Sequence, residues 1–358
     1  MQKKKIIFFV QGEGRGHLMQ AIGLSEKIDF ESFEICAVVY GKSSKKKQIP
    51  DFFKNNFNCE IIELLSPSFY QKRNKKGISI PLTTLNFLRN LRNYFSSVRQ
   101  THDLIKKHKP EIILNFYDPL MALYLLFYKK EFHYYGIGHQ YIYLHDDFSF
   151  PKGKIIQRLL IKSYTKFTAF NSDKLFALSF YPLKKQDKLI VVPPILRKEI
   201  LGKEGKNDKF ILVYLSNNGF LKELFDWHQK NDACVVHCFT DKTNLKGHDY
   251  TDENFYVHQI NDKEFIDKLI HCEALCCTAG FEAVCEAMYL SKPVLMIPME
   301  NHFEQFCNSR DAYFAGAGIY SDSFDLSPLL NFRNSFSGVE SFKHWVGKND
   351  LRLNSDFI

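Results

Sequence analysis

One connection in the second half of the chain has residue types suited to binding a phosphate. Ala274–Cys277 is apolar and strand-like and leads into Thr278-Ala279-Gly280, after which apolar residues recur at the spacing of one helix face, namely Phe281, Val284, Cys285 and Met288. A helix N-terminus that follows a glycine turn presents unpaired backbone N–H groups and about half a positive charge, which suits an anion. The same pattern is also a common packing connection in α/β proteins, so that alternative stays open.

Two glutamates and a later group of polar residues extend this candidate site. Glu282 and Glu286 lie four residues apart, so their carboxylates project from the same side of the expected helix and can accept hydrogen bonds from sugar hydroxyls. A second strand over residues 294–297 ends at Pro298, and the polar residues Glu304, Gln305 and Asn308 follow it. We interpret the whole stretch as one candidate site.

A glycine-rich loop near the start of the chain is a second candidate. Residues 11–17 read Gln-Gly-Glu-Gly-Arg-Gly-His and join an apolar strand to a helix. The glycines Gly12, Gly14 and Gly16 permit close approach of the backbone to a ligand. Their spacing differs from the dinucleotide fingerprint, and the strand over 35–40 ends without the acidic residue that would hold a ribose. A nicotinamide or flavin cofactor is therefore not expected.

Polar residues that follow strands in the first half could act on a substrate. His17 lies at a helix N-terminus, which disfavours the imidazolium ion and leaves the neutral ring that a general base requires. Asp118 follows a strand over 111–115, and His139 and Gln140 follow a strand over 133–137. Ligands of parallel sheets bind outside the carboxyl ends of the strands, so these side chains could line a cleft. The alternatives are a structural His17, a turn at Asp118 and a surface loop at His139.

The order of apolar segments predicts an α/β protein with two doubly wound, parallel sheets. Strand-like and helix-like segments alternate along the 358 residues, a length that favours two domains. A polar linker is expected at 193–208, where two prolines interrupt the pattern and charged residues follow. We therefore expect an N-terminal domain over 1–195 and a C-terminal domain over 208–325.

The charge is divided unevenly between the two halves. Residues 1–195 carry 31 Lys and Arg against 16 Asp and Glu, whereas residues 196–358 carry 17 against 24. The basic half is expected to face an anionic partner. Within it, residues 66–109 interleave Lys and Arg with aromatic side chains, so this segment either contacts anionic membrane or is a solvated helix face. No recognition motif accompanies the charge, and nucleic acid is not expected.

No apolar run is long enough for a signal peptide or a transmembrane helix, which predicts a cytoplasmic protein, at most peripheral to a membrane. Nine cysteines lie mostly in apolar segments and are expected to be reduced core residues rather than metal ligands.

These motifs resemble the two-domain glycosyltransferases of GT-B fold, in particular the bacterial branch with the peptidoglycan N-acetylglucosaminyltransferase and the diacylglycerol glycosyltransferases. In that family a glycine-rich loop ending in Gly-His follows the first strand, as Gly14-Arg15-Gly16-His17 does here. The resemblance implies two Rossmann-like domains that face each other across a cleft, and a C-terminal segment, 326–358, that returns to the first domain. The acceptor side would comprise Gly12, Gly14, Arg15, Gly16, His139 and Gln140.

The donor half of that family has a helix whose N-terminus holds the diphosphate and whose glutamate binds ribose. Residues 278–286 resemble this helix, with Glu286 in the ribose position and Glu282 acting only as a charge at the helix end. Residues 298–308 resemble the proline and acidic-Gln pair that contacts the donor sugar, and residues 256–259 resemble a motif that stacks on uracil. The expected donor-binding set is Ser216, Asn217, Gln259, Thr278, Ala279, Gly280, Phe281, Glu282, Glu286, Glu304 and Gln305.

The resemblance implies an inverting transfer from a nucleotide-diphosphate sugar, UDP-linked, to an acceptor hydroxyl, with no other cofactor. His17 would deprotonate the acceptor, a lipid-linked or cell-envelope glycan being one candidate, and Asp118 would orient the His17 ring. The chain has no Asp-x-Asp sequence, which agrees with a metal-independent reaction in which a helix N-terminus stabilises the leaving diphosphate. The alternatives are a nucleotide-sugar epimerase or hydrolase of the same fold and a catalytically silent binding protein.

Overall fold

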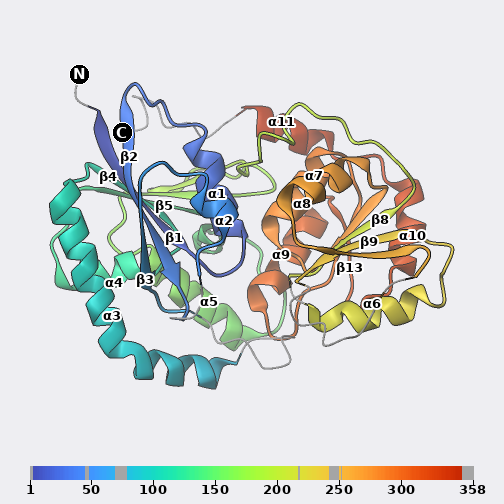
Figure 1. The fold of residues 1–358 in the computed structure, drawn as a ribbon, viewed down its shortest axis with the longest axis horizontal. Helices are drawn as coiled ribbons and strands as arrows, with labels where there is room; N and C mark the ends of the chain where they lie inside the picture. The colour runs from blue at the N-terminus through green and yellow to red at the C-terminus, as the bar shows by residue number, and fades with distance from the viewer. Residues whose placement is uncertain are drawn as a thin grey trace. The chain divides into compact units, whose positions relative to one another are not determined.

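The computed structural model describes residues 3–44, 48–68, 79–216, 218–241, 250 and 252–348. The described residues form two α/β units, one ending at Ile195 and the other running from Leu196 to Lys348. Each unit is built on one sheet in which neighbouring strands are parallel (Figure 1).

The first unit has a seven-stranded sheet in the order β3-β2-β1-β4-β5-β6-β7. Its strands read as continuous apolar runs because parallel strands are covered on both faces; Ile6, Ile7, Phe8 and Phe9 of β1 are completely buried. The elements are β1 Lys4–Gln11, α1 Gly16–Ser25, β2 Phe33–Lys42, α2 Asp51–Lys54, β3 Glu60–Leu65, α3 Ile80–His108, β4 Ile112–Phe116, α4 Leu120–Phe127, β5 His133–Gly138, the 3-10 helix η1 His139–Leu144, α5 Ile155–Thr168, β6 Lys174–Leu178 and β7 Leu189–Val192.

The reversal of strand order at β1 places the helices of this unit on both faces of its sheet. From β1 the chain moves to β2 and β3 through α1 and α2, then returns to β4, β5 and β6 through α3, α4 and α5. Right-handed crossovers in opposite directions put these two groups of helices on opposite faces. Within the second group, α3 packs against α4 and α4 against α5 (Figure 1).

The second unit has a six-stranded sheet in the order β10-β9-β8-β11-β12-β13. Its core is formed by side chains from the strands and from α6 and α10, including Val213, Leu224, Cys276 and Leu329. The elements are β8 Ile211–Tyr214, η2 Asn218–Phe220, α6 Leu221–His228, β9 Val236–Thr240, β10 Phe255–Gln259, α7 Asp262–His271, β11 Ala274–Cys277, α8 Phe281–Tyr289, β12 Val294–Met296, α9 Phe303–Phe314, β13 Gly318–Tyr320, α10 Ser327–Phe332, η4 Arg333–Ser335 and α11 Glu340–Lys348.

The expected α/β class with two parallel sheets is confirmed. Two strands were missed, β7 and β13, because one precedes a pair of prolines and the other is only three residues long and begins at a glycine. At the C-terminus, α11 buries Phe342, Trp345 and Val346 and packs against α8 of the second unit. Residues 349–358, which complete the segment expected to return to the first unit, lie outside the described residues.

Candidate active site

The glycine-rich loop of the first unit passes close to the end of β2. A Cβ on Gly12 would lie 2.5 Å from the ring of Tyr40 and 2.7 Å from the carbonyl oxygen of Gly41, so a larger residue would displace the loop. The Gly12 N–H donates to that same carbonyl at 2.8 Å. Gly14 has a φ of +75°, which favours glycine, and α1 begins at Gly16. These glycines therefore fix the position of His17 in the first turn of α1.

His17 is buried and neutral, with both ring nitrogens in hydrogen bonds. Its Nδ1 lies 3.3 Å from Oε1 of Gln20, one turn later in α1, and its Nε2 lies 3.3 Å from the amide nitrogen of Gln140 in η1. The Gln140 amide can only donate, so Nε2 is the acceptor and Nδ1 carries the proton. Burial lowers the His17 pKa to about 4, although the hydrogen bond to Gln20 partly opposes this shift. Nε2 thus carries the lone pair that a general base needs.

The ring of Tyr117 stacks on His17, with 5.7 Å between centroids. Tyr117 follows β4 directly and has a φ of +60°, a conformation that costs free energy in a non-glycine residue. Its hydroxyl lies 2.7 Å from the hydroxyl of Thr165 in α5, which fixes the ring. Sequence reasoning missed Gln20 and Tyr117; Gln20 had a usable signal, because a residue three positions after His17 lies on the same helix face.

Asp118 does not orient the His17 ring, contrary to expectation. Both nitrogens of that ring are taken by glutamine side chains, and the Asp118 carboxylate accepts hydrogen bonds from the Ser66 hydroxyl at 2.7 Å and the Leu120 N–H at 2.8 Å. Its Oδ2 lies only 1.7 Å from the point that a Cβ on Gly41 would occupy, so the carboxylate fills the space that this glycine leaves. Burial raises the pKa of Asp118 to about 6. Asp118 therefore joins the ends of β2, β3 and β4.

Two other expected acceptor-side residues contact groups within their own unit. The guanidinium of Arg15 lies 3.9 Å from the ring centroid of Phe52. His139 is almost completely buried, with its Nδ1 2.7 Å from the carbonyl oxygen of Leu178. Of the residues that follow β5, Gln140 thus reaches His17, whereas His139 ties η1 to the end of β6.

In the second unit, the connection between β11 and α8 has an uncommon backbone conformation. Ala279 has a φ of +52°, and Gly280 is the N-cap residue, in an extended conformation without a capping side chain. Apart from its chain neighbours and the backbone of α8, no described residue lies within 4 Å of the point that a Cβ on Gly280 would occupy. A left-handed residue before a helix start orients successive backbone N–H groups toward one point. The N-terminus of α8 is therefore open and suited to an anion.

Hydroxyl groups from neighbouring strands meet beside this turn. The Thr278 hydroxyl, after β11, donates to the hydroxyl of Ser216, after β8, at 3.1 Å. Ser216 in turn lies 3.8 Å from the Met299 sulfur, after β12. Parallel strands end at the same edge of the sheet, which explains why residues so distant in sequence come together. Asn217, the neighbour of Ser216 in the expected set, lies outside the described residues.

Helix α9 supplies the amide side chains of this group. Oε1 of Gln305 accepts a hydrogen bond from the backbone N–H of Met299 at 2.8 Å, and the Asn308 amide donates to the carbonyl oxygen of Ala279 at 3.3 Å. The second contact ties α9 to the left-handed residue of the β11–α8 turn. The structure thus brings together Ser216, Thr278, Ala279 and Gln305, which are members of the expected donor-binding set, and adds Met299.

The expected ribose ligand, Glu286, is held by an ion pair that the sequence did not reveal. Both of its carboxylate oxygens accept from the guanidinium of Arg197, and the side chains are 4% and 10% exposed. Arg197 also lies 3.8 Å from the carboxylate of Asp262 in α7. A carboxylate has about four acceptor positions, so a bidentate arginine leaves some of them for another donor.

The remaining members of the expected donor set have separate positions. Phe281 is buried, so its backbone is the part available to a ligand. Glu282 and Glu304 are half-buried in the first turns of α8 and α9, where a negative charge is favourable. Gln259 is exposed at the end of the edge strand β10, which β9 separates from β8. Within the described residues, no three His, Cys, Asp or Glu side chains could together hold a metal ion.

Comparison with known proteins gives the chain a family. Residues 4–334 match the model of the family described as glycosyl transferase family 1. A search of curated proteins gave no match.

Among solved structures, the glycotransferase of kitacinnamycin is similar at 13% identity and a TM-score of 0.64, over 97% of this chain and 94% of that one. CalG4, the calicheamicin glycosyltransferase, is similar at 13% identity and a TM-score of 0.61, over 97% and 94%. Phytolacca americana UGT2, complexed with UDP-2-fluoro-glucose and pterostilbene, is similar at 9% identity and a TM-score of 0.60, over 95% and 92%.

At these identities the solved structures establish the fold, which is GT-B, while the family match covers most of the chain. The chain therefore belongs to glycosyl transferase family 1 and is a glycosyltransferase that takes its sugar from a nucleotide donor.

Proposed function

We propose that this enzyme catalyses an inverting, metal-independent transfer of a hexosyl or N-acetylhexosaminyl group from a UDP-linked donor to an acceptor hydroxyl. The observation that carries the proposal is the open N-terminus of α8, behind the left-handed Ala279 and beside the hydroxyls of Ser216 and Thr278. Backbone N–H groups and hydroxyls are donors that suit a diphosphate. As the bond to the sugar breaks, they would stabilise the charge on the leaving group in place of a metal ion.

His17 is the proposed general base. The acceptor hydroxyl replaces the Gln140 amide as the hydrogen-bond donor to Nε2, which takes the proton as the acceptor oxygen bonds to the anomeric carbon. Attack from the face opposite the departing diphosphate inverts the configuration. Gln20 accepts from Nδ1–H throughout and so holds the ring. A base placed in this way contributes about 10² to 10⁴-fold to the rate.

Glu286 is the proposed ligand of the ribose hydroxyls. Arg197 fixes its carboxylate, and the remaining acceptor positions are available to the nucleoside. Gln305 and Asn308, anchored to Met299 and Ala279, support a contact of α9 with the donor sugar. Uracil recognition near Gln259 is part of the same proposal.

For the acceptor we propose a lipid-linked or cell-envelope glycan at the inner face of a membrane, which the basic segment 66–109 would contact. The excess of Lys and Arg in the first half supports this proposal. Residues 69–78 of that segment lie outside the described residues.

A thermal-shift screen of nucleotide sugars followed by product analysis tests the function. A specific donor should raise the melting temperature by mass action, and its sugar should reach the acceptor with inverted configuration at the anomeric carbon. His17→Ala should lower turnover by about 10² to 10⁴-fold while leaving the donor-induced shift unchanged. Turnover within threefold of wild type would remove His17 from its role, and release of free sugar from the donor alone would indicate a hydrolase.

A further inference from the structure

The first unit exposes large apolar side chains on the outer side of α3, α4 and α5, here called the three-helix face. Most of the large apolar residues that are exposed in the described part of the chain lie on these three helices. Soluble monomers rarely expose so many apolar side chains together, and such a group usually marks an interaction surface.

Helix α5 is the most exposed part of this face. Ile155 and Ile156 are each 70% exposed, and Leu159 and Leu160, one turn later, are 60% and 46% exposed. Residues four apart lie on the same side of a helix, so these four form one apolar patch. The buried residues of α5 are Thr165 and Thr168, and the Thr165 hydroxyl contacts that of Tyr117 at the end of β4, so the patch is left exposed by the residues that the structure describes.

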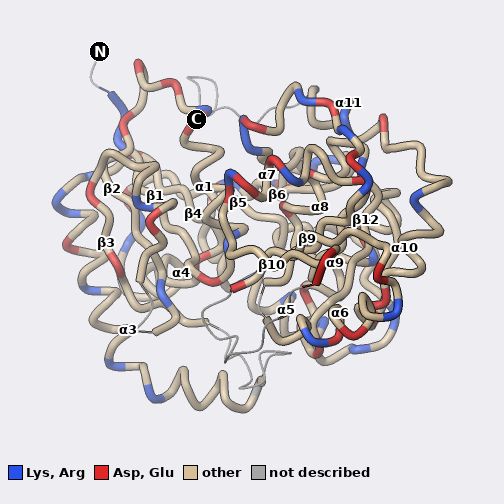
Figure 2. Tube along the Cα trace, turned by 45° about the vertical axis from the view of Figure 1, so that its right-hand side comes forward, with Lys and Arg blue, Asp and Glu red and all other residues tan. Residues whose placement is uncertain are grey.

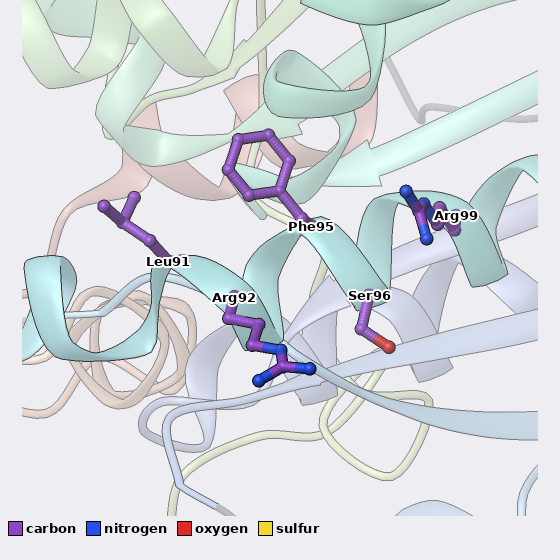
Figure 3. A pocket seen from close by; sticks show the side chains of 5 residues that line it. All are labelled: Leu91, Arg92, Phe95, Ser96 and Arg99. Atoms are coloured by element: carbon purple, nitrogen blue, oxygen red, sulfur yellow. The ribbon is translucent and has the colours of Figure 1, made fainter.

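Helices α3 and α4 continue the apolar surface. Leu88 and Phe95 of α3 are 57% and 49% exposed, and the ring of Phe95 contacts the ring of Phe127 at the end of α4, with 5.5 Å between centroids. Figure 3 shows Leu91 and Phe95 on one side of α3 and Arg92 on the other, around an open hollow of about 620 Å³. An apolar side and a cationic side thus adjoin on the exposed surface of this helix.

Along the parts of these helices that carry the exposed apolar residues, the charge has a single sign, and the one acidic residue of α3, Asp103, lies beyond them. Residues 79–102 and 152–170 contain no Asp or Glu, and α4 has no charged residue. The first range carries Arg89, Arg92 and Arg99, and the second carries Lys152, Lys154, Arg158, Lys162 and Lys166. In Figure 2 the N-terminal part of α3, at the lower edge of the view, shows basic segments and no acidic ones.

We propose that the three-helix face docks on a bilayer that contains anionic lipids, with the first turns of α5 inserted at the level of the headgroups. Apolar side chains flanked by Lys and Arg are the composition of interfacial helices, whose cations bind lipid phosphates while the apolar side enters the acyl boundary. A second copy of this chain is a poorer occupant, because two such faces would oppose like charges. No helix in the described residues is long and apolar enough to cross a membrane, so contact would be at the surface.

Co-sedimentation of the full chain with vesicles tests this proposal. We expect binding to phosphatidylcholine vesicles that contain phosphatidylglycerol, weaker binding to pure phosphatidylcholine, and a decrease at high salt. Ile155→Asn with Ile156→Asn should lower the partition coefficient at least about tenfold, since both side chains leave the apolar boundary. The matched control is Tyr313→Asn with Phe314→Asn on α9, because Phe314 is 74% exposed but belongs to the second unit.

Two charge-reversal variants, one in each unit, complete the test. Lys152→Glu with Lys166→Glu should weaken binding by more than about 25-fold, since each cation near an anionic surface contributes about fivefold. Lys230→Glu with Lys263→Glu changes the net charge equally in the second unit and should have a much smaller effect. Equal losses in test and control variants, or no binding to anionic vesicles, would overturn the proposal.

Self-association is the competing outcome. If light scattering showed a dimer that Ile155→Asn with Ile156→Asn dissociates, the face would be an interface between copies and the proposal would be wrong. This inference rests on the proposed function only in placing the acceptor at the membrane. Vesicle binding itself is measured without substrates. An enzyme that transfers sugar to a soluble acceptor but does not bind vesicles would refute this inference and leave the function intact.

Discussion

Replacing Arg197 by Met should destabilise the second unit by about 3–5 kcal/mol. The side chains of Arg197 and Glu286 are only 10% and 4% exposed, so the substitution leaves a buried carboxylate without its bidentate partner. Loss of one member of a buried ion pair typically costs that amount. Replacing both residues, as Arg197→Met with Glu286→Leu, removes the uncompensated charge, and we expect the double variant to recover at least about 2 kcal/mol of the loss.

The pair between Arg333 and Glu273 provides a matched control within the same unit. It has the same chemistry, but its side chains are 28% and 20% exposed, so water compensates more of the lost interaction. Arg333→Met should therefore cost about 1 kcal/mol or less.

Urea unfolding followed by tryptophan fluorescence is the appropriate assay. The only two tryptophans of the chain, Trp227 and Trp345, are buried in the second unit, so the signal reports on the unit that contains both ion pairs. The reasoning is refuted if Arg197→Met costs no more than Arg333→Met, or if the effects of Arg197→Met and Glu286→Leu are additive.

Three further predictions concern the two sites. Because burial lowers the His17 pKa to about 4, the acid limb of kcat/KM should fall near pH 4; a limb near pH 6.5 would show that His17 is not the buried base. The Asp118 pKa is raised from 3.8 to about 6, so wild type should lose about 2 kcal/mol of stability as the pH rises from 4 to 7, and Asp118→Asn should not. The prediction is wrong if the free energy of urea unfolding depends on pH in the same way in wild type and in Asp118→Asn. Glu286→Ala should weaken UDP binding in calorimetry at a temperature where the variant is folded, whereas unchanged affinity would exclude the ribose contact.

The fold was predictable because each strand of a parallel sheet is an apolar run between polar turns. Ser216 and Thr278 meet at one sheet edge because each comes just after a strand of the parallel sheet. It failed where a strand was too short to give a pattern, as at residues 318–320.

Side-chain partners were less predictable, because they depend on packing between distant segments. Nothing local to Glu286 indicates that Arg197, 89 positions earlier, occupies its carboxylate. Asp118 appeared to be a partner of His17 because both follow strands, yet its contact with Ser66 depends on the space left by Gly41. The left-handed conformation of Ala279 is equally hidden, since alanine carries no signal for a positive φ.

The distribution of cysteines makes thiol alkylation a selective measure of opening in one half of the molecule. All nine cysteines are free, and the buried ones are Cys36 in the first unit and Cys238, Cys272, Cys276, Cys277, Cys285 and Cys307 in the second. Burial raises the pKa values of six of them, Cys36, Cys238, Cys272, Cys276, Cys277 and Cys285, to about 12 for Cys272, so these thiols remain protonated and unreactive while the core is closed. Modification of the buried second-unit thiols therefore requires exposure of the strands and helices that form the proposed donor side. Its rate, with and without nucleotide, would report how strongly a ligand suppresses local unfolding there.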